Sequence, residues 1–262
     1  MAVNKTLVLR GDPIVIDEKI TLKQPTVNDI MEFGEEKFFG VFWGMCSSAY
    51  DRPSFFADMG VDFMLVSDWE YFLSVARSLN KEATSLIFGD FDFSEFTIQK
   101  RMVEDKQEYI LLRESDSLIF DEAEYQKVIP YVREMTNFHH TGKKAANKST
   151  AKLLIMDDRR ERERNKNKEY ESMLFNIIVS LVNTEEFSYT YKTVYDLTIY
   201  QLMKSFVQIN GKKNAMALLQ GSMSGFMDTS SISSEAFQWT YSEEKYKPKG
   251  KKLINRKTTK KH

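Results

Sequence analysis

The chain has 262 residues, of which 42% are apolar, 29% charged and 13% aromatic, the composition of a folded globular protein. It holds one cysteine and no run of about 18 apolar residues, which excludes an internal disulfide framework and predicts no membrane-spanning helix. Its net charge of −1 conceals two opposed halves. Residues 1–140 hold 25 acidic and 14 basic side chains, whereas residues 141–262 hold 13 acidic and 23 basic. The length and the uneven charge distribution together predict that the chain has two domains.

The acidic part, residues 1–138, is predicted to mix short strands and helices. Runs of β-branched residues at 6–9, 14–16 and 20–22, separated by Gly, Pro and Asp, predict a small antiparallel meander. A helix entry capped by Thr26 follows, and the aromatic-rich residues 30–45 predict a buried helix. Further expected elements are a loop over 51–66, an amphipathic helix capped by Ser67, strands at 91–96, 109–112 and 118–120, and a helix over 122–137 capped by Asp121.

The basic part is predicted to be helical. Polar residues 139–152 lack an apolar period and predict a linker, followed by a helical domain over 153–244. One helix begins at the charged run 157–164 and continues through an apolar 3-4 pattern, a second covers about 193–209, and a third, short one covers 215–226. The first two predict an antiparallel hairpin, which makes the whole chain α+β. The expected seam residues are Met173, Leu174, Ile177, Ile178, Leu181, Val194, Leu197 and Phe206.

Recognisable catalytic motifs are lacking, so we expect no enzymatic activity, no cofactor and no metal site. Cys46 lies in an apolar run, which predicts a buried, inert thiol. His139 and His140 are adjacent, so on a helix they would diverge by about 100° and would not share one ion. Neither a G-x-x-x-x-G-K-[ST] nor a G-x-G-x-x-G string occurs, and Met223 stands where a nucleophile elbow needs serine.

Four aspartates, Asp58, Asp62, Asp90 and Asp92, are of the type that holds Mg²⁺ in phosphoryl-transfer enzymes. The alternation of Asp and Phe at 90–93 is also what a half-buried strand requires, so these aspartates do not by themselves indicate a metal site. We expect the phenylalanines to be buried and the aspartates to face water.

The last 18 residues, 245–262, contain nine Lys or Arg and no acidic residue, and we expect this tail to be disordered. It could bind nucleic acid through phosphates, dock on an acidic protein surface, or keep the chain soluble. Its one aromatic residue, Tyr246, argues against base stacking. The candidate nucleic-acid contacts are Lys249, Lys251, Lys252, Arg256 and Lys257.

The string Thr-Val-Tyr-Asp-Leu-Thr-Ile-Tyr-Gln-Leu at 193–202, followed by Phe206 and preceded by Glu-Phe-Ser-Tyr at 186–189, resembles the C-terminal region of tail assembly chaperone-like proteins of tailed bacteriophages of Gram-positive hosts. The segment Pro25–Ile30 is similar to the strand-to-helix entry of these proteins. The resemblance covers residues 150–210 well and the first 140 residues loosely, and no residue of the string is catalytic.

This resemblance implies a late-expressed viral protein that binds the tape-measure protein and aids assembly of the tail tube in the host cytoplasm. Within the string we expect Asp196 and Thr198 to cap the helix entry and Tyr195, Tyr200 and Gln201 to face a protein partner. Two alternatives stay open: a tail or baseplate component retained in the virion, and a nucleic-acid-binding phage accessory protein. A homo-oligomer is also compatible with the sequence.

Overall fold

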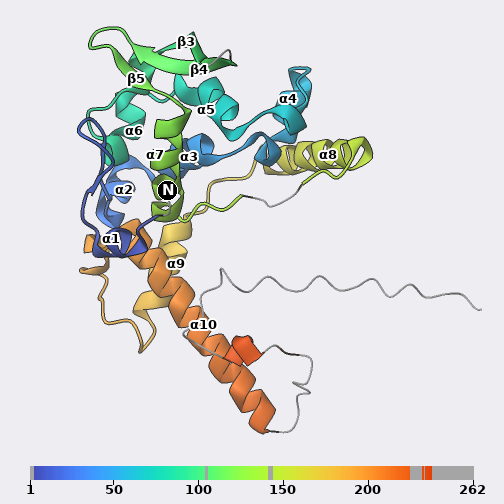
Figure 1. The fold of residues 1–262 in the computed structure, drawn as a ribbon. Helices are drawn as coiled ribbons and strands as arrows, with labels where there is room; N and C mark the ends of the chain where they lie inside the picture. Colours follow the sequence, from blue (N-terminus) through green and yellow to red (C-terminus); the bar gives the residue numbers. More distant parts are fainter. Residues whose placement is uncertain (1–2, 104–105, 141–143, 225–231, 233, 238–262) are drawn as a thin grey trace, which may run out of the picture. The chain divides into compact units, whose positions relative to one another are not determined.

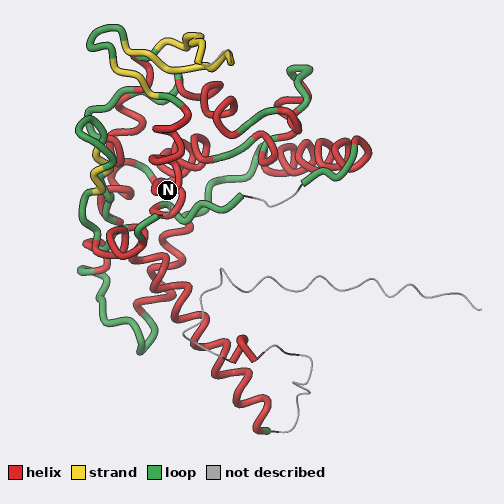
Figure 2. Tube along the Cα trace, viewed as in Figure 1, coloured by secondary structure: helices red, strands yellow, loops and turns green. Residues whose placement is uncertain are grey.

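The computed structural model describes residues 3–103, 106–140, 144–224, 232 and 234–237. Contacts divide the chain into two compact units, residues 1–204 and 205–262, which are treated separately. Helices dominate and the strands form two small antiparallel sheets, so the fold class is α+β, as predicted (Figure 1 and Figure 2). No helix in the described part of the chain is long and apolar enough to cross a membrane.

The N-terminal elements, in chain order, are α1 (Lys5–Arg10), β1 (Ile14–Val15), β2 (Thr21–Leu22), α2 (Val27–Phe33), α3 (Glu35–Cys46), η1 (Ala49–Asp51), α4 (Pro53–Asp58), η2 (Phe63–Leu65), α5 (Asp68–Ala76) and α6 (Lys81–Phe88). These are followed by η3 (Phe93–Glu95), β3 (Thr97–Val103), β4 (Lys106–Arg113), β5 (Leu118–Phe120), α7 (Glu122–Met135), α8 (Lys148–Asn165), α9 (Met173–Val182), η4 (Val194–Asp196), α10 (Ile199–Met223) and η5 (Ser234–Phe237).

Three predicted helix starts are confirmed with their caps. Thr26 and Ser67 each form a capping box, with Asp29 and Glu70 respectively, and open α2 and α5. Asp121 accepts hydrogen bonds from two backbone amides at the start of α7. Pro130 does not interrupt α7, which continues to Met135.

The predicted strands at 14–16, 20–22, 109–112 and 118–120 are also confirmed. β1 pairs with β2, and β3, β4 and β5 form a second antiparallel sheet in that order. Phe120 of β5 lies in an aromatic cluster with its ring centroid 5.3 Å from that of Phe93 and 5.8 Å from that of Phe72. Phe72 also contacts Tyr125 at 5.1 Å, so one cluster joins the sheet to α5 and α7. This aromatic packing is the core of the acidic part.

Three predictions for the first 66 residues are wrong. Residues 6–9 form helix α1 rather than a strand, because Asn4 caps it and Gly11, in the left-handed conformation, ends it. The predicted loop over 51–66 contains α4, which begins at Pro53. Proline is favoured in the first turn of a helix, where its missing N–H costs nothing. The helix predicted through residues 30–45 is divided at Gly34 into α2 and α3.

The predicted strand over 91–96 is absent, and the chain forms the short helix η3 (Phe93–Glu95) there, because Asp92 accepts a hydrogen bond from the amide of Ser94 and turns the chain. The predicted orientation holds for three of the four residues, since Phe91 and Phe93 are buried and Asp90 is exposed, whereas Asp92 is half-buried. The strand β3 comes immediately afterwards and was not predicted, since its sequence, Thr-Ile-Gln-Lys-Arg-Met-Val, has no regular alternation of apolar and polar residues.

The helices of the basic part have other limits than predicted. The charged run and the apolar pattern belong to separate helices, α8 and α9, because Ser172 caps a new helix start. The two helices predicted at 193–209 and 215–226 are one helix, α10, which begins at Ile199 and ends at Met223.

The predicted domain limits at 138, 153 and 244 stay predictions. Residues 141–143 of the predicted linker lie outside the described residues, and α8 begins at Lys148, inside that linker, with Asn147 as its cap. The helix packs through Ala151, Leu154 and Ile155 on a core cluster that includes Phe56 and Tyr71. The packing attaches α8 to α4, η1 and α5.

Candidate protein interaction surface

A buried carboxylate attaches α9 to the acidic part of the first unit. Glu35, the first residue of α3, is 6% exposed. One of its oxygens accepts the backbone N–H of Leu174 at 2.9 Å, and the other accepts the hydroxyl of Ser172, the α9 cap. Glu35 therefore lies at the starts of two helices, where the helix dipoles favour a negative charge.

Tyr170 lies close to the same carboxylate. Burial and the interaction with the Glu35 carboxylate both raise the pKa of the Tyr170 phenol. Ser172 also accepts the amide of Phe175 at 3.0 Å, which completes the cap. The start of α9 is thus fixed by a small polar network around one carboxylate.

The start of α10 is fixed by a second, nearly symmetric junction. The amide of Val27 donates to the carbonyl of Leu197 at 2.8 Å, and the amide of Ile199 donates to the carbonyl of Pro25 at 3.2 Å. These two bonds form an antiparallel bridge between Thr26 and Thr198. Thr26 caps α2 and Thr198 precedes α10, so this backbone bridge connects the starts of two helices.

Thr198 and Gln201 form a capping box at this junction, with Thr198 Oγ1 accepting at 3.2 Å and Gln201 Oε1 accepting at 2.9 Å. Gln201 Nε2 also donates to the carbonyl of Leu9 at 2.9 Å. Tyr200 is buried and donates its hydroxyl to Glu134 at 2.9 Å, whereas Tyr195 is half-buried. Two of the three residues predicted to face a partner therefore join the string to the rest of the first unit.

We expect Gly11→Ala to destabilise the first unit through this junction. Gly11 has a φ of 79°, and an added Cβ would lie 3.0 Å from Cγ2 of Thr198. Gly60 has a φ of 73° and no atom within 4 Å of its Cβ position, so Gly60→Ala is the matched control for backbone strain alone. Thermal unfolding should show a cost of about 1 kcal/mol for Gly60→Ala and about 1–2 kcal/mol more for Gly11→Ala.

Adding Thr198→Ser to Gly11→Ala removes the methyl group but keeps the capping hydroxyl, and should recover the difference between the two glycine variants. Equal costs for Gly11→Ala and Gly60→Ala would show that Thr198 does not press on Gly11.

Most of the predicted seam residues are buried. Leu174, Ile177, Ile178 and Leu181 form the inner face of α9, and Val194 and Leu197 precede α10, all less than 9% exposed. Met173 is half-buried. Phe206 is half-buried and belongs to the second unit. In the first unit the seam residues thus follow the predicted period.

The outer face of α9 carries an apolar row beside the polar residues Asn176 and Ser180. Phe175 is 61% exposed, and the half-buried Val179 follows one turn later on the same side of the helix. A further turn on, Asn183 donates its side-chain amide to the hydroxyl of Tyr191 at 2.9 Å, which places that ring, 51% exposed, at the end of the row. We call Phe175, Val179 and Tyr191 the aromatic face. Sequence reasoning missed it because an exposed and a buried phenylalanine look alike in an apolar run.

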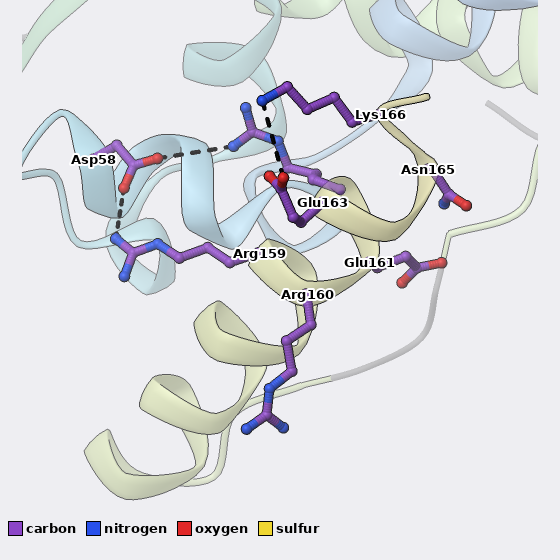
Figure 3. Close-up of a pocket in the computed structure, with 8 residues that line it drawn as sticks. Asp58, Arg159, Arg160, Glu161, Glu163, Asn165 and Lys166 are labelled. Atoms are coloured by element: carbon purple, nitrogen blue, oxygen red, sulfur yellow. Dashed lines mark hydrogen bonds and ion pairs between the residues drawn. The ribbon is translucent and has the colours of Figure 1, made fainter. Parts of the chain in front are cut away.

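An open pocket of about 880 Å³ lies beside the charged half of α8 (Figure 3). Asp58 of α4 pairs with Arg159 at 2.5 Å and with Arg162 at 3.8 Å, and Arg162 also donates to Ser54 at 3.0 Å. The lining residues include both acidic and basic side chains, Glu163 pairs with Lys166 at 3.9 Å, and Asp58 and Arg159 are each about half exposed. The pocket is thus a solvated helix–helix contact of opposite charges.

The other candidate residues are separated by the fold. Burial raises the pKa of the Cys46 thiol to about 12, in accord with the predicted inert thiol. His140 lies 2.7 Å from Asp51, Asp90 pairs with Lys81, and Asp62 caps η2. Within the described residues no group of three or more His, Cys, Asp or Glu could hold a metal ion.

The candidate nucleic-acid contacts, Lys249, Lys251, Lys252, Arg256 and Lys257, lie outside the described residues, as does the whole tail from residue 245.

In a comparison with protein families, residues 165–243 match the family model described as the YomV second domain. No curated protein and no solved structure matches the chain. The matched range includes α9, the junction at Thr198, the aromatic face and α10. It also includes the string at 193–202 that carries the resemblance described above.

Proposed function

We propose that the chain is a non-enzymatic tail assembly protein of a bacteriophage, similar to tail assembly chaperones, which binds tape-measure and tail-tube proteins during assembly in the host cytoplasm. The proposed partners come from the resemblance of the string at 193–202. The match of residues 165–243 to the YomV second domain supports treating that segment as one evolutionary module.

The observation that carries a binding role is the aromatic face. Phe175 and Tyr191 are 61% and 51% exposed, yet the helix beneath them is fixed by the buried Glu35 network and an apolar inner face. Large aromatic side chains held in place on a rigid element lose little conformational entropy on binding, and such residues dominate the energetics of protein interfaces. A partner would therefore bind α9 from outside without rearranging the fold.

Co-expression with the tail proteins encoded in the same genome tests this proposal. The full chain should co-purify with the tape-measure protein and should be absent from purified mature particles. If the chain is present in particles in stoichiometric amounts, it is a structural tail component instead. Retention on DNA that is lost with salt, and lost on deletion of residues 245–262, would assign the chain to the nucleic-acid-binding class.

Replacing both Phe175 and Tyr191 with serine should weaken partner binding at least tenfold and leave the melting temperature nearly unchanged, because neither ring belongs to the core. Calorimetric titration with the co-purified partner measures the first effect and thermal unfolding the second. Phe55→Ser, which alters an aromatic ring 43% exposed on α4, is the matched control and should bind normally. Equal binding by all variants would exclude the aromatic face as the contact.

A further inference from the structure

Helix α8 supplies polar contacts at both ends of the short helix α4. α4 has six residues, fewer than an isolated helix needs to be stable in water, and its cap residue Arg52 makes no side-chain hydrogen bond to it. Instead, the amide of Ser54 in the first turn donates to a carboxylate oxygen of Asp158 in α8 at 2.9 Å. At the other end, Arg159 pairs at 2.5 Å with Asp58, a negative charge that the helix dipole disfavours there (Figure 3). α8 thus caps α4 at both ends.

The inner face of α8 is one continuous amphipathic stripe. Its members follow one another at alternating intervals of three residues and one residue, which places them on one side of the helix. The apolar half packs on the core cluster that contains Phe56 and Tyr71, and the charged half meets α4. The stripe consists of Ala151, Leu154, Ile155, Asp158, Arg159 and Arg162. α8 therefore occupies its groove in the way in which an amphipathic helical peptide binds a partner protein.

The attachment of α8 is small for a helix of 18 residues. Of its side chains only Ala151 is less than 9% exposed, and Leu154 and Ile155 are half-buried. Its ion pairs with α4 are about half exposed, so each contributes little. Among the described residues of 136–147 and 166–172 there is no helix or strand. No other helix or strand of the described chain therefore has to break for α8 to leave the groove.

We propose that α8 is a detachable cover on a binding groove for an amphipathic helix. In the closed form that the structure shows, α8 itself fills the groove. When α8 leaves, α4 loses the contacts at both of its ends and opens with it, which exposes Phe56, Phe63 and Tyr71, each at most 4% exposed in the closed form.

The stripe of α8 defines the partner that fits the groove. Such a helix carries two adjacent apolar residues, as at Leu154 and Ile155, and three positions later an aspartate that caps α4. A partner with this stripe re-forms α4 as it binds. The groove is separate from the aromatic face on α9, so this proposal goes beyond the proposed function and does not rest on it.

Hydrogen exchange of the full chain tests whether α4 and α8 open together. The amides of residues 59–61, which donate to carbonyls of α4, should be protected to the same degree as those of α8 and at least tenfold less than those of α5 and α7. Asp158→Ala removes the cap of α4 and should lower protection in both helices about five- to tenfold. Asp157→Ala removes the neighbouring carboxylate, which pairs with Arg160 within α8, and should leave α4 unchanged.

Two results of the exchange experiment would overturn the proposal. Equal protection of α4, α8 and α7 would show that α8 leaves the groove only when the whole unit unfolds. Equal protection of α4 in Asp158→Ala and Asp157→Ala would show that α8 does not order α4.

A labelled synthetic peptide of residues 147–166 tests the groove as a helix-binding site. Leu154→Asp disables the chain's own α8, so the peptide should bind this variant at least tenfold more tightly than wild type, in which α8 competes. Leu153→Asp makes the same change on the outer side of α8, where Leu153 is 60% exposed, and should bind the peptide as weakly as wild type. A peptide with serine in place of Leu154 and Ile155 should bind neither variant.

Protection of α5 and α7 shows whether Leu154→Asp is folded. If that protection is lost, Asp158→Ala takes its place, with a gain in peptide affinity of about five- to tenfold, equal to its loss of protection. Equal peptide binding by the folded opening variant and Leu153→Asp would overturn the groove as a helix-binding site. None of these results depends on whether the aromatic face binds a tail protein.

Discussion

Glu35→Ala is expected to lower the free energy of unfolding of the first unit by about 2–4 kcal/mol, since each buried hydrogen bond to a charged group contributes about 1.5–3 kcal/mol. The alanine would leave the amide of Leu174 and the hydroxyl of Ser172 without their acceptor in a buried position. It would also remove the negative charge from the starts of α3 and α9. Chemical denaturation, followed by circular dichroism, measures the loss.

Two further variants distinguish the loss of the Glu35 charge from the effect of removing any carboxylate from this turn of α3. Glu36→Ala removes a carboxylate from the same turn of α3, but Glu36 is exposed, so the stability should change by less than about 0.5 kcal/mol. Glu35→Gln keeps the shape and one acceptor oxygen while placing an amide donor against the donors of α9, so it should lie between wild type and alanine. If Glu35→Ala and Glu36→Ala unfold alike, the Glu35 network does not hold α9.

The Glu35 network is a contact between distant segments that could not be predicted from the sequence. Glu35 and Ser172 are 137 positions apart, and each alone looks like an ordinary exposed polar residue near a helix start. Thr26, Ser67 and Asp121 were predicted as caps because their partners lie within three residues. Local patterns thus identified these three helix starts, whereas contacts between distant segments required the fold.

The errors have the same origin. Residues 6–9 have β-branched and apolar side chains typical of strands, but Asn4 and Gly11 at the two ends outweigh that preference and make a helix. The inner and outer faces of α9 both contain large apolar residues, so the period located the buried face without showing that Phe175 is exposed. Tyr200 illustrates the converse, since it was expected to face a protein partner but is buried and donates its hydroxyl to Glu134 within the first unit.

The opposed charges of the two halves meet inside the first unit. Glu134, from the acidic half, pairs with Lys204 at 3.3 Å, and Asp58 pairs with Arg159 at 2.5 Å. The Asp58–Arg159 pair is about half exposed, and pairs of that kind contribute about 0–1 kcal/mol each. The apolar packing of α9 and the capped junctions are the larger contributions.

Ile177→Asp should test that apolar packing most directly, with an expected loss of about 4 kcal/mol or more. Ile177 is 7% exposed on the inner face of α9, so the substitution removes a buried side chain and places an unpaired carboxylate in the same position. Ile177→Ala removes the packing alone and should cost about 2–4 kcal/mol. The difference between the two variants measures the cost of the buried charge.

Asn176→Asp is the matched control, because it adds the same charge one position earlier on the exposed side of the same helix. It should leave helicity and melting temperature close to those of the wild type, while Ile177→Asp should lower both. Hydrogen exchange can then show where the loss occurs: if α9 packs as described, protection should fall first over residues 173–182 and only later in the aromatic cluster around Phe72. Unchanged helicity and melting of Ile177→Asp would mean that the inner face of α9 contributes little to stability, and the aromatic face would then lack the rigid support on which its proposed binding role depends.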